Sequence, residues 1–355
     1  MEILWINLVV VYITSFLSRY FSKPLPLDAP YIRPNKLLIF MTMLSLVLVA
    51  GLRNNIGDTF FYMHSYKIGN HDLSTMKMEG DFGFNIYQAL LYKLSEDPQL
   101  LVFTSALITN IFIVYVLYCF SKKIELSLFV YITSGVYIVT MNGIRQSLAA
   151  AIIFAATRYL LNGNMKKFFL VVLLASTIHQ TALIFIPIYF IVRRDAWTKT
   201  TLIILGIGVI IAFGFNQFSS LLFSAIQDTQ YGHYSNFSEG GANFLRAVVS
   251  GTPLLIAFLG KEKLKKIWPK SDYIINLSLL GLVFMIIATK NWIFARFDIY
   301  FGLYSLILVS WLLNLFSKES RNLVYYCILL LYTFYFYYEN VISLGLKYGS
   351  EYLKI

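Results

Sequence analysis

The sequence predicts an all-α, polytopic integral membrane protein with roughly 10–12 transmembrane helices. Of its 355 residues, 58% are apolar, 17% are aromatic and only 13% are charged, and the mean hydropathy is +0.67. Apolar runs of about 17 to 22 residues recur along the whole chain, and a helix of that length crosses a hydrocarbon core of about 30 Å. No long polar segment remains for a soluble domain, so residues 1–355 are predicted to form a single integral membrane domain.

Hydropathy places the spans in order along the chain. The predicted runs are Glu2–Phe21, Lys36–Leu52, Gln99–Ser121, Glu125–Met141, Ser147–Leu161, Phe168–Val192, Thr200–Ser220, Phe244–Gly260, Ser271–Thr289, Phe297–Phe316 and Asn322–Val341. Most Lys and Arg residues lie in the short loops between them, where basic residues set membrane topology. The net charge of +11 therefore does not indicate nucleic-acid binding.

The run Phe168–Val192 is predicted to be a broken, re-entrant pair of short helices. If it crossed the membrane once, the basic loops at Arg193–Arg194 and Lys261–Lys270 would fall on the outward side, against the positive-inside rule. Two short helices that enter from the cytoplasm, break at Thr177–Thr181 and return remove this conflict. A break inside the membrane is tolerated where it packs in protein or lines a wet cavity, so it predicts a site.

Two long extracytoplasmic loops are predicted. In the loop of residues 53–98, the apolar residues of Gly83–Leu94 follow helical spacing, which predicts an interfacial helix that could form a lid. The second loop, residues 221–243, is polar and contains the glycine pair Gly240–Gly241.

Several common chemistries find no motif in this sequence. The histidines are scattered, and Cys119 and Cys327 lie inside apolar runs, so neither a metal site nor a disulfide framework is predicted. The chain has no P-loop and no Gly-x-Gly-x-x-Gly to hold a nucleotide, and no Gly-x-Ser-x-Gly elbow of a serine hydrolase.

Cations beside the outward ends of the apolar runs are the first candidates for function, because charge at that depth is expensive. The planar guanidinium suits phosphate oxygens, so converging arginines predict a clamp for a lipid pyrophosphate. The alternative is that these side chains extend to the interface without contacting a substrate. The residues are Arg53, Arg145, Arg246, Lys290 and Arg296.

His179 lies at the predicted helix break, and a histidine there can accept a proton near neutral pH. The alternative is a buried hydrogen-bond partner between helices. Asp58 heads the first outer loop, where it could orient an arginine, bind a sugar hydroxyl, act as the base, or form a salt bridge with Arg53. Asp298 is expected to orient Arg296, which lies two residues before it.

Four segments together resemble the EpsG family of Wzy-like polysaccharide polymerases, in order and over essentially the whole chain. They are Gly51-Leu52-Arg53 through Gly57-Asp58-Thr59 and Tyr62, then Asn142–Ala149, then Ala175–Leu183 with Pro187, and finally Arg296–Phe301. Many relatives separate the Gly and the Asp of the first motif by one residue, whereas Gly57 and Asp58 are adjacent here.

The resemblance implies a glycosyltransferase with a GT-C-like membrane architecture. Such polymerases join oligosaccharide repeat units carried on undecaprenyl pyrophosphate at the outer face of the bacterial inner (cytoplasmic) membrane, in O-antigen, capsule or exopolysaccharide synthesis. A metal-independent, inverting transfer without a cofactor is expected, with a chain-length regulator and a flippase as partners. The expected roles are catalysis for His179 and Asp58, pyrophosphate binding for Arg53, Arg145 and Arg296, and other substrate contacts for Gln146, Tyr62 and Arg246.

Two other functions remain open at this point. A lipid-linked oligosaccharide flippase or another transporter could use the same arginines to hold phosphate and the broken helix as a gate. A glycan transferase like an O-antigen ligase shares the donor chemistry, so the arginines do not distinguish it from a polymerase.

Overall fold

The computed structural model describes residues 1–22, 33–215, 218 and 240–353. Within these residues the regular structure is helical and contains no β-strand. The first half of the bundle consists of α1 (Glu2–Tyr20), α2 (Lys36–Gly51), α3 (Thr59–Ile68), α4 (Phe82–Tyr92), α5 (Gln99–Phe120), α6 (Ile124–Thr133), α7 (Val136–Asn142), α8 (Ile144–Ala155) and α9 (Thr157–Asn162). The second half consists of α10 (Met165–Ile178), η1 (Gln180–Ile184), α11 (Phe185–Val192), α12 (Lys199–Phe213), α14 (Phe244–Leu259), α15 (Lys261–Ile267), α16 (Ser271–Ala288), η3 (Trp292–Phe294), α17 (Ala295–Leu312), η4 (Leu313–Leu315), α18 (Lys318–Tyr337) and the π-helix η5 (Tyr338–Ser343).

Several of these helices have the length and composition of membrane spans. In the described part of the chain, α1, α5, α16 and the continuous helical segment Trp292–Leu315 each pass that test alone. The bent pairs α6–α7, at 55°, and α14–α15, at 82°, pass it together, and α2, η1–α11 and α12 are shorter apolar helices. The prediction of an all-α polytopic membrane protein with broken helices is confirmed, while the number of crossings stays a prediction.

The predicted break in the run Phe168–Val192 is present. After α10 the backbone of His179 is extended, at φ −153° and ψ 115°, and the short 3₁₀-helix η1 leads into α11. The rings of Phe168 and Tyr189 pack with their centroids 5.3 Å apart, and Arg193 at the end of α11 donates to the carbonyl of Leu160, just before α10. The segment therefore enters and returns at the same end of the bundle.

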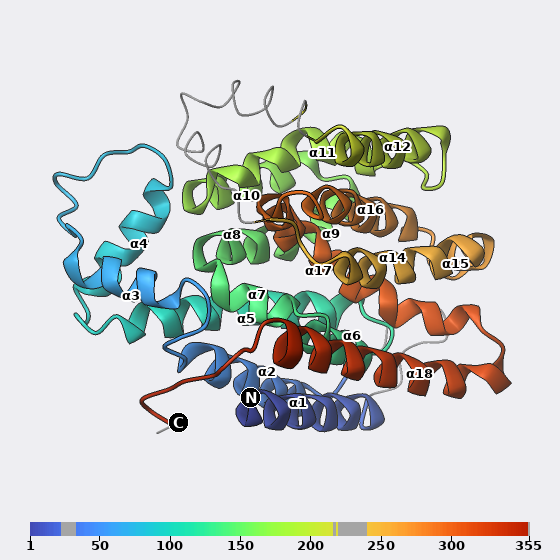
Figure 1. Cartoon of the computed structure of the whole chain (residues 1–355), viewed down its shortest axis with the longest axis horizontal. Helices are drawn as coiled ribbons and strands as arrows, with labels where there is room; N and C mark the ends of the chain where they lie inside the picture. The colour runs from blue at the N-terminus through green and yellow to red at the C-terminus, as the bar shows by residue number, and fades with distance from the viewer. Residues whose placement is uncertain (23–32, 216–217, 219–239, 354–355) are drawn as a thin grey trace.

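The loops separate into two ends of the bundle, as the charge pattern predicts (Figure 1). At the basic end, Lys270 Nζ contacts Asn162 Oδ1 at 2.7 Å. At the opposite end, the amide of Asn54 donates to the carbonyl of Gly349 at 3.0 Å. Figure 1 shows α3 and α4 at one end and α15 at the other.

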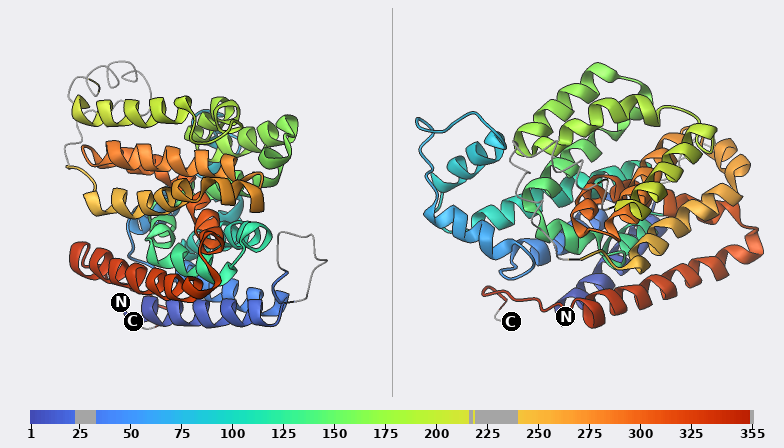
Figure 2. Two further views of the ribbon diagram at one scale, coloured as in Figure 1. Left: turned by 90° about the vertical axis from the view of Figure 1, so that its right-hand side faces the viewer. Right: turned by 45° about the horizontal axis from the view of Figure 1, so that its top comes forward.

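The helix pair α3 and α4 forms a small unit of its own at the end opposite the basic loops. Buried Tyr66 and Phe84 pack with Leu101 and Val102 of α5 in a separate apolar cluster. In the right-hand view of Figure 2 this blue segment extends beyond the other helices. The helix predicted over Gly83–Leu94 is present as α4, whereas α3 was not predicted.

The central helix is α17, which is buried along most of its length. Its Phe301 ring stacks on Phe284 of α16, with centroids 5.6 Å apart and planes inclined by 6°. The first turn of α17 carries Arg296 and Asp298, so the helix presents different side chains to the two regions that it separates. Of the predicted second loop, residues 221–239, including His233 and Asp228, lie outside the described residues.

Candidate active site

The helix break places His179 against a carboxylate that the sequence did not single out, Asp81. Its Oδ2 lies 2.9 Å from His179 Nδ1, and its Oδ1 accepts the Gln180 amide at 3.0 Å. The Asp81 side chain is only 5% exposed and that of His179 is 12% exposed. An ionised carboxylate can only accept, so Nδ1 carries a proton, and in the neutral form of the ring Nε2 keeps its lone pair. That nitrogen can take up a proton.

Arg145, in the first turn of α8, contacts the same carboxylate. Its Nη1 lies 3.2 Å from Asp81 Oδ2, and its guanidinium is 5.9 Å from each of the ring centroids of Tyr62 and Phe84. Its side chain is 43% exposed, so a ligand can reach it. Tyr62 thus lies beside Arg145, as the predicted grouping requires.

The charges around Asp81 fix its protonation state. Burial alone would raise the pKa of this carboxyl, but the hydrogen bond and charge of His179, the Gln180 amide and the Arg145 guanidinium outweigh burial. The pKa of Asp81 is therefore held below its ordinary value, and the group is ionised at neutral pH.

Arg296 and Asp58 form the other side of the candidate site. Arg296 Nη2 lies 3.8 Å from Asp58 Oδ2, and the guanidinium is 5.2 Å from the centroid of Trp292. The two side chains are 34% and 40% exposed. Gln146 is buried, and its Nε2 donates to the Arg296 carbonyl at 2.8 Å, so it joins the start of α17 to α8.

The adjacent Gly57 and Asp58 have a local explanation. Gly57 has φ +54°, and a Cβ there would lie 2.3 Å from Asn142 Oδ1. The same oxygen accepts the Asp58 amide at 2.9 Å. The close approach of Gly57 to the end of α7 thus places Asp58 beside Arg296.

Arg53 is buried behind the first of the sequence motifs, and the residue is only 1% exposed. It donates to Thr59 Oγ1 at 3.0 Å, to the Met141 carbonyl at 2.5 Å and to the Ala50 carbonyl. Those carbonyls belong to the last turns of α7 and α2, where no intrahelical donor follows. Burial lowers the pKa of Arg53 to about 10, so it remains charged at neutral pH. This geometry fits a helix-capping role and offers no exposed face to a pyrophosphate.

Arg246 is also remote from His179. It binds Glu339 through Nε at 2.7 Å and through Nη2, in a cavity on another side of α17 that contains Asp298. Residues two apart on a helix project about 200° from one another, which explains why Asp298 does not accompany Arg296. Arg246 is thus not part of the His179 site.

The structure therefore brings most of the predicted site residues together and adds Asp81. The predicted residues that meet are Asp58, Tyr62, Arg145, Gln146, His179 and Arg296. In the described part of the chain, no three His, Cys, Asp or Glu side chains gather closely enough to hold a metal ion. The arrangement combines a proton acceptor, its orienting carboxylate and two reachable guanidiniums.

Comparison with known proteins agrees with this picture. A model of the EpsG family matches residues 36–352, which is most of the chain. No curated protein and no solved structure matches it. From the extent of the family match, the multi-pass membrane protein described here belongs to the EpsG family.

Proposed function

We propose that the protein is a polysaccharide polymerase that joins oligosaccharide repeat units carried on undecaprenyl pyrophosphate. Its family and its multi-pass fold are those of a membrane protein of polysaccharide biosynthesis. The observation that carries the proposal is the Asp81–His179 pair beside Arg145, at the end of the bundle with few basic loops. By the positive-inside rule we expect that end to face the exterior, so we assign the proposed reaction to the outer face of the bacterial cytoplasmic membrane.

The proposed reaction is a direct displacement at the anomeric carbon of the donor chain. A hydroxyl oxygen of the acceptor repeat unit bonds to that carbon while the bond to the pyrophosphate oxygen breaks. Undecaprenyl pyrophosphate leaves with the electron pair, and the anomeric configuration inverts. His179 Nε2 takes the hydroxyl proton, and Asp81 stabilises the imidazolium that forms.

The arginines would stabilise the leaving group. Arg145 and Arg296 each lie near a carboxylate, Asp81 or Asp58, and pyrophosphate oxygens would compete for the same guanidinium donors. Fixed positive charge aimed at a developing anion is an effective form of transition-state stabilisation. This proposal needs no metal ion and no cofactor.

The polymerase would act with other proteins of the same membrane. A flippase would deliver the lipid-linked repeat unit to the outer leaflet, and a chain-length regulator would limit the product. A ligase and a transporter remain the rival functions, because both would bind the same lipid pyrophosphate.

One experiment separates these functions. The purified protein is supplied with one defined undecaprenyl-pyrophosphate-linked repeat unit, and the products are resolved as a ladder. A polymerase lengthens the unit unaided, a ligase needs a second acceptor, and a transporter leaves the unit unchanged.

The matched variants for this assay are His179→Gln and Arg145→Lys, with Lys347→Gln as a control at the same end of the bundle. We expect both site variants to lose the ladder and the control to keep it. A full ladder from His179→Gln would remove histidine from the chemistry, and no ladder from the wild-type protein would count against polymerisation itself.

A further inference from the structure

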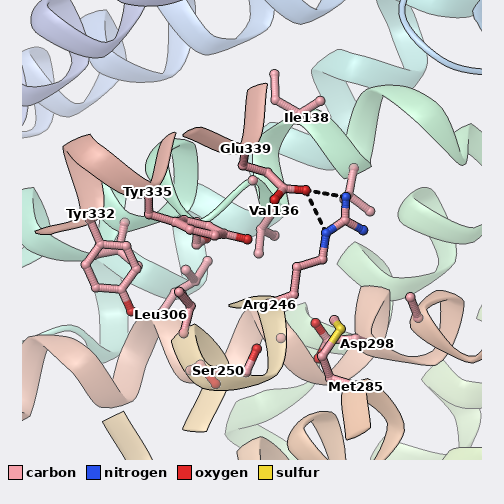
Figure 3. A pocket seen from close by; sticks show the side chains of 18 of the residues that line it. Val136, Ile138, Arg246, Ser250, Met285, Asp298, Leu306, Tyr332, Tyr335 and Glu339 are labelled. Carbon is pink, nitrogen blue, oxygen red and sulfur yellow. Dashed lines mark hydrogen bonds and ion pairs between the residues drawn. The ribbon is translucent and has the colours of Figure 1, made fainter. Parts of the chain in front are cut away.

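A cavity of about 130 Å³ is lined by residues of α6, α7, α14, α17 and α18 (Figure 3). The ion pair of Arg246 with Glu339 crosses it, and Asp298 and Ser250 lie near the base of the arginine side chain. None of the groups proposed for the displacement at His179 lines it. It is therefore a separate feature of the outward half of the bundle.

Two carboxylates in this cavity have unused acceptors. Glu339 is 3% exposed, and a single oxygen, Oε1, receives both donors of Arg246. Its other oxygen, Oε2, is buried without a hydrogen-bond partner among the described residues. The carboxylate of Asp298 likewise has no hydrogen bond or ion pair to a described residue. Buried acceptors are normally satisfied, so Glu339 Oε2 points to a ligand that donates a hydrogen bond into this cavity.

The charge of the cavity limits what that ligand can be. Two carboxylates face one guanidinium, which leaves one net negative charge when both acids are ionised. A phosphate would be repelled, in contrast to the Arg145 and Arg296 side of α17. An uncharged group with hydroxyl donors, such as a sugar, meets the need for donors without adding negative charge.

The walls favour a ring with apolar faces. The aliphatic side chains of Val249 and Leu306 and the rings of Tyr332 and Tyr335 line the cavity around its few polar groups. Apolar walls with a small number of converging polar atoms are typical of small-molecule sites. A cavity of about 150 Å³ accepts benzene, so this one, at about 130 Å³, has room for about one small ring.

We propose that this cavity binds one uncharged sugar ring of the glycan, whose hydroxyls donate to Glu339 Oε2 and Asp298. The inference rests on the proposed function and deepens it. The first turn of α17 then serves two parts of one substrate, with Arg296 towards the pyrophosphate and Asp298 towards the sugar. A sugar ring brings the hydroxyl donors and the C–H faces that the cavity requires.

The test measures binding of lipid-free oligosaccharide and needs no turnover. Oligosaccharides released by mild acid from the surface glycan of the source strain are titrated against the purified protein, with saturation-transfer NMR as the readout. Ser250→Phe puts a bulky ring into the cavity, and Thr252→Phe places the same ring on an exposed position of α14. Glu339→Gln keeps an acceptor for Arg246 but removes charge, with Glu262→Gln at the far end as its control.

We expect Ser250→Phe, which blocks the cavity, and Glu339→Gln, which removes one acceptor, to weaken binding by about tenfold or more, and both controls to bind like the wild type. Binding that is absent in the wild type, or unchanged in Ser250→Phe, overturns the proposal. So does the finding that Ser250→Phe removes a co-purifying lipid while oligosaccharide binding persists.

The outcome is independent of polymerisation. His179→Gln should bind the oligosaccharide like the wild type while forming no ladder. If the wild type binds the oligosaccharide through this cavity but never lengthens a lipid-linked unit, the sugar site stands and the polymerase proposal fails. If the wild type forms a ladder but Ser250→Phe binds the oligosaccharide normally, the polymerase proposal stands and the sugar site fails.

Discussion

At the scale of single residues, the arginines divide by whether a substrate can reach them. The side chains of Arg145 and Arg296 are 43% and 34% exposed, whereas Arg53 is 1% exposed. A guanidinium that exchanges a carboxylate for pyrophosphate must be accessible. Arg145 and Arg296 are therefore open to a ligand, whereas Arg53 is held by hydrogen bonds inside the fold.

Replacing Arg53 by Lys should lower stability. A lysine ammonium cannot serve Thr59, Ala50 and Met141 together, and one buried carbonyl left without a donor costs about 1–3 kcal/mol. Thermal unfolding of the purified protein should show a lower Tm for Arg53→Lys and an unchanged Tm for Arg145→Lys. If Arg53→Lys has a normal Tm but no activity, Arg53 would instead be assigned to substrate binding.

Replacing Asp81 by Asn should reduce turnover. The amide can donate to Nδ1 and stabilise the tautomer whose Nε2 bears a proton, so the base is lost. We expect kcat to fall by about 100- to 10,000-fold, the usual contribution of a general base, with little change in KM. Asp72→Asn, in the exposed part of the same loop, is the control. Equal kcat in the two variants would show that Asp81 does not position the histidine.

The protonation of Asp81 also has a consequence for stability. Its folded pKa lies below the ordinary 3.8, so its contribution is complete above about pH 3.8 and disappears as the pH falls through the lower folded value. The difference in Tm between the wild type and Asp81→Asn should be constant above that pH. Below it, the difference should shrink to zero. A difference that closes already between pH 5 and 7 would contradict this assignment.

The sequence identifies His179, Arg145 and Arg296 because each lies at a break or an end of an apolar run. Asp81 carries no such signal, since it lies in a long polar loop, 98 residues before its partner. Only the preference of aspartate for helix N-termini draws attention to it, and its carboxylate serves Gln180 instead of α4. A contact between residues so far apart in the sequence cannot be predicted from the local pattern of residues.

At the scale of elements, the contact of α4 with the end of α10 holds the site together. A Cβ on Gly83 would lie 2.3 Å from Thr177 Oγ1 and 2.9 Å from the Thr177 carbonyl oxygen. The two helices can approach this closely because the position is glycine. Asp81 reaches His179 as a result of that approach.

Gly83→Ala should therefore reduce activity by moving α4 away from the helix break. We expect a fall in kcat without loss of the folded bundle, because α4 lies at its edge. Gly206→Ala is the control, since a Cβ there meets no atom within 4 Å. Full activity in Gly83→Ala would mean that Asp81 does not depend on this contact.

The break between α10 and η1 could be predicted because charge must balance between the two faces of the membrane. The bend of 55° between α6 and α7 could not, although Gly135 with φ +87° lies at it. Hydropathy shows a single apolar run through Glu125–Met141, and it contains no information on whether the helix axis bends within that run. The helix α3 was not predicted, because its sequence is only weakly apolar and hydropathy does not detect it.

At the scale of the whole molecule, the two ends of the bundle carry different chemistry. The start of α10 and the end of α11 lie at the basic end of the bundle, and the break between them, with His179, lies at the other end. Helix order and this alternation follow from loop charge. The division of polar groups between two faces of α17 does not, because it depends on how neighbouring helices are rotated.

Single cysteines test this topology in a variant that lacks Cys119 and Cys327. We expect Asn164→Cys and Asp195→Cys, at the two ends of the α10–α11 segment, to react with a membrane-impermeant thiol reagent from the cytoplasmic side. Asp72→Cys should react from the exterior. Labelling of positions 164 and 195 from opposite sides would show that the segment crosses once and would remove the basis for the site.

The loop that delivers Asp81 offers a route to control from outside the cell. His179 is recessed, yet the residue that orients it arrives on the exposed α3–α4 unit. We expect an antibody fragment bound to this unit to move Asp81 away from His179. Selection of inhibitors could thus be directed at the α3–α4 unit.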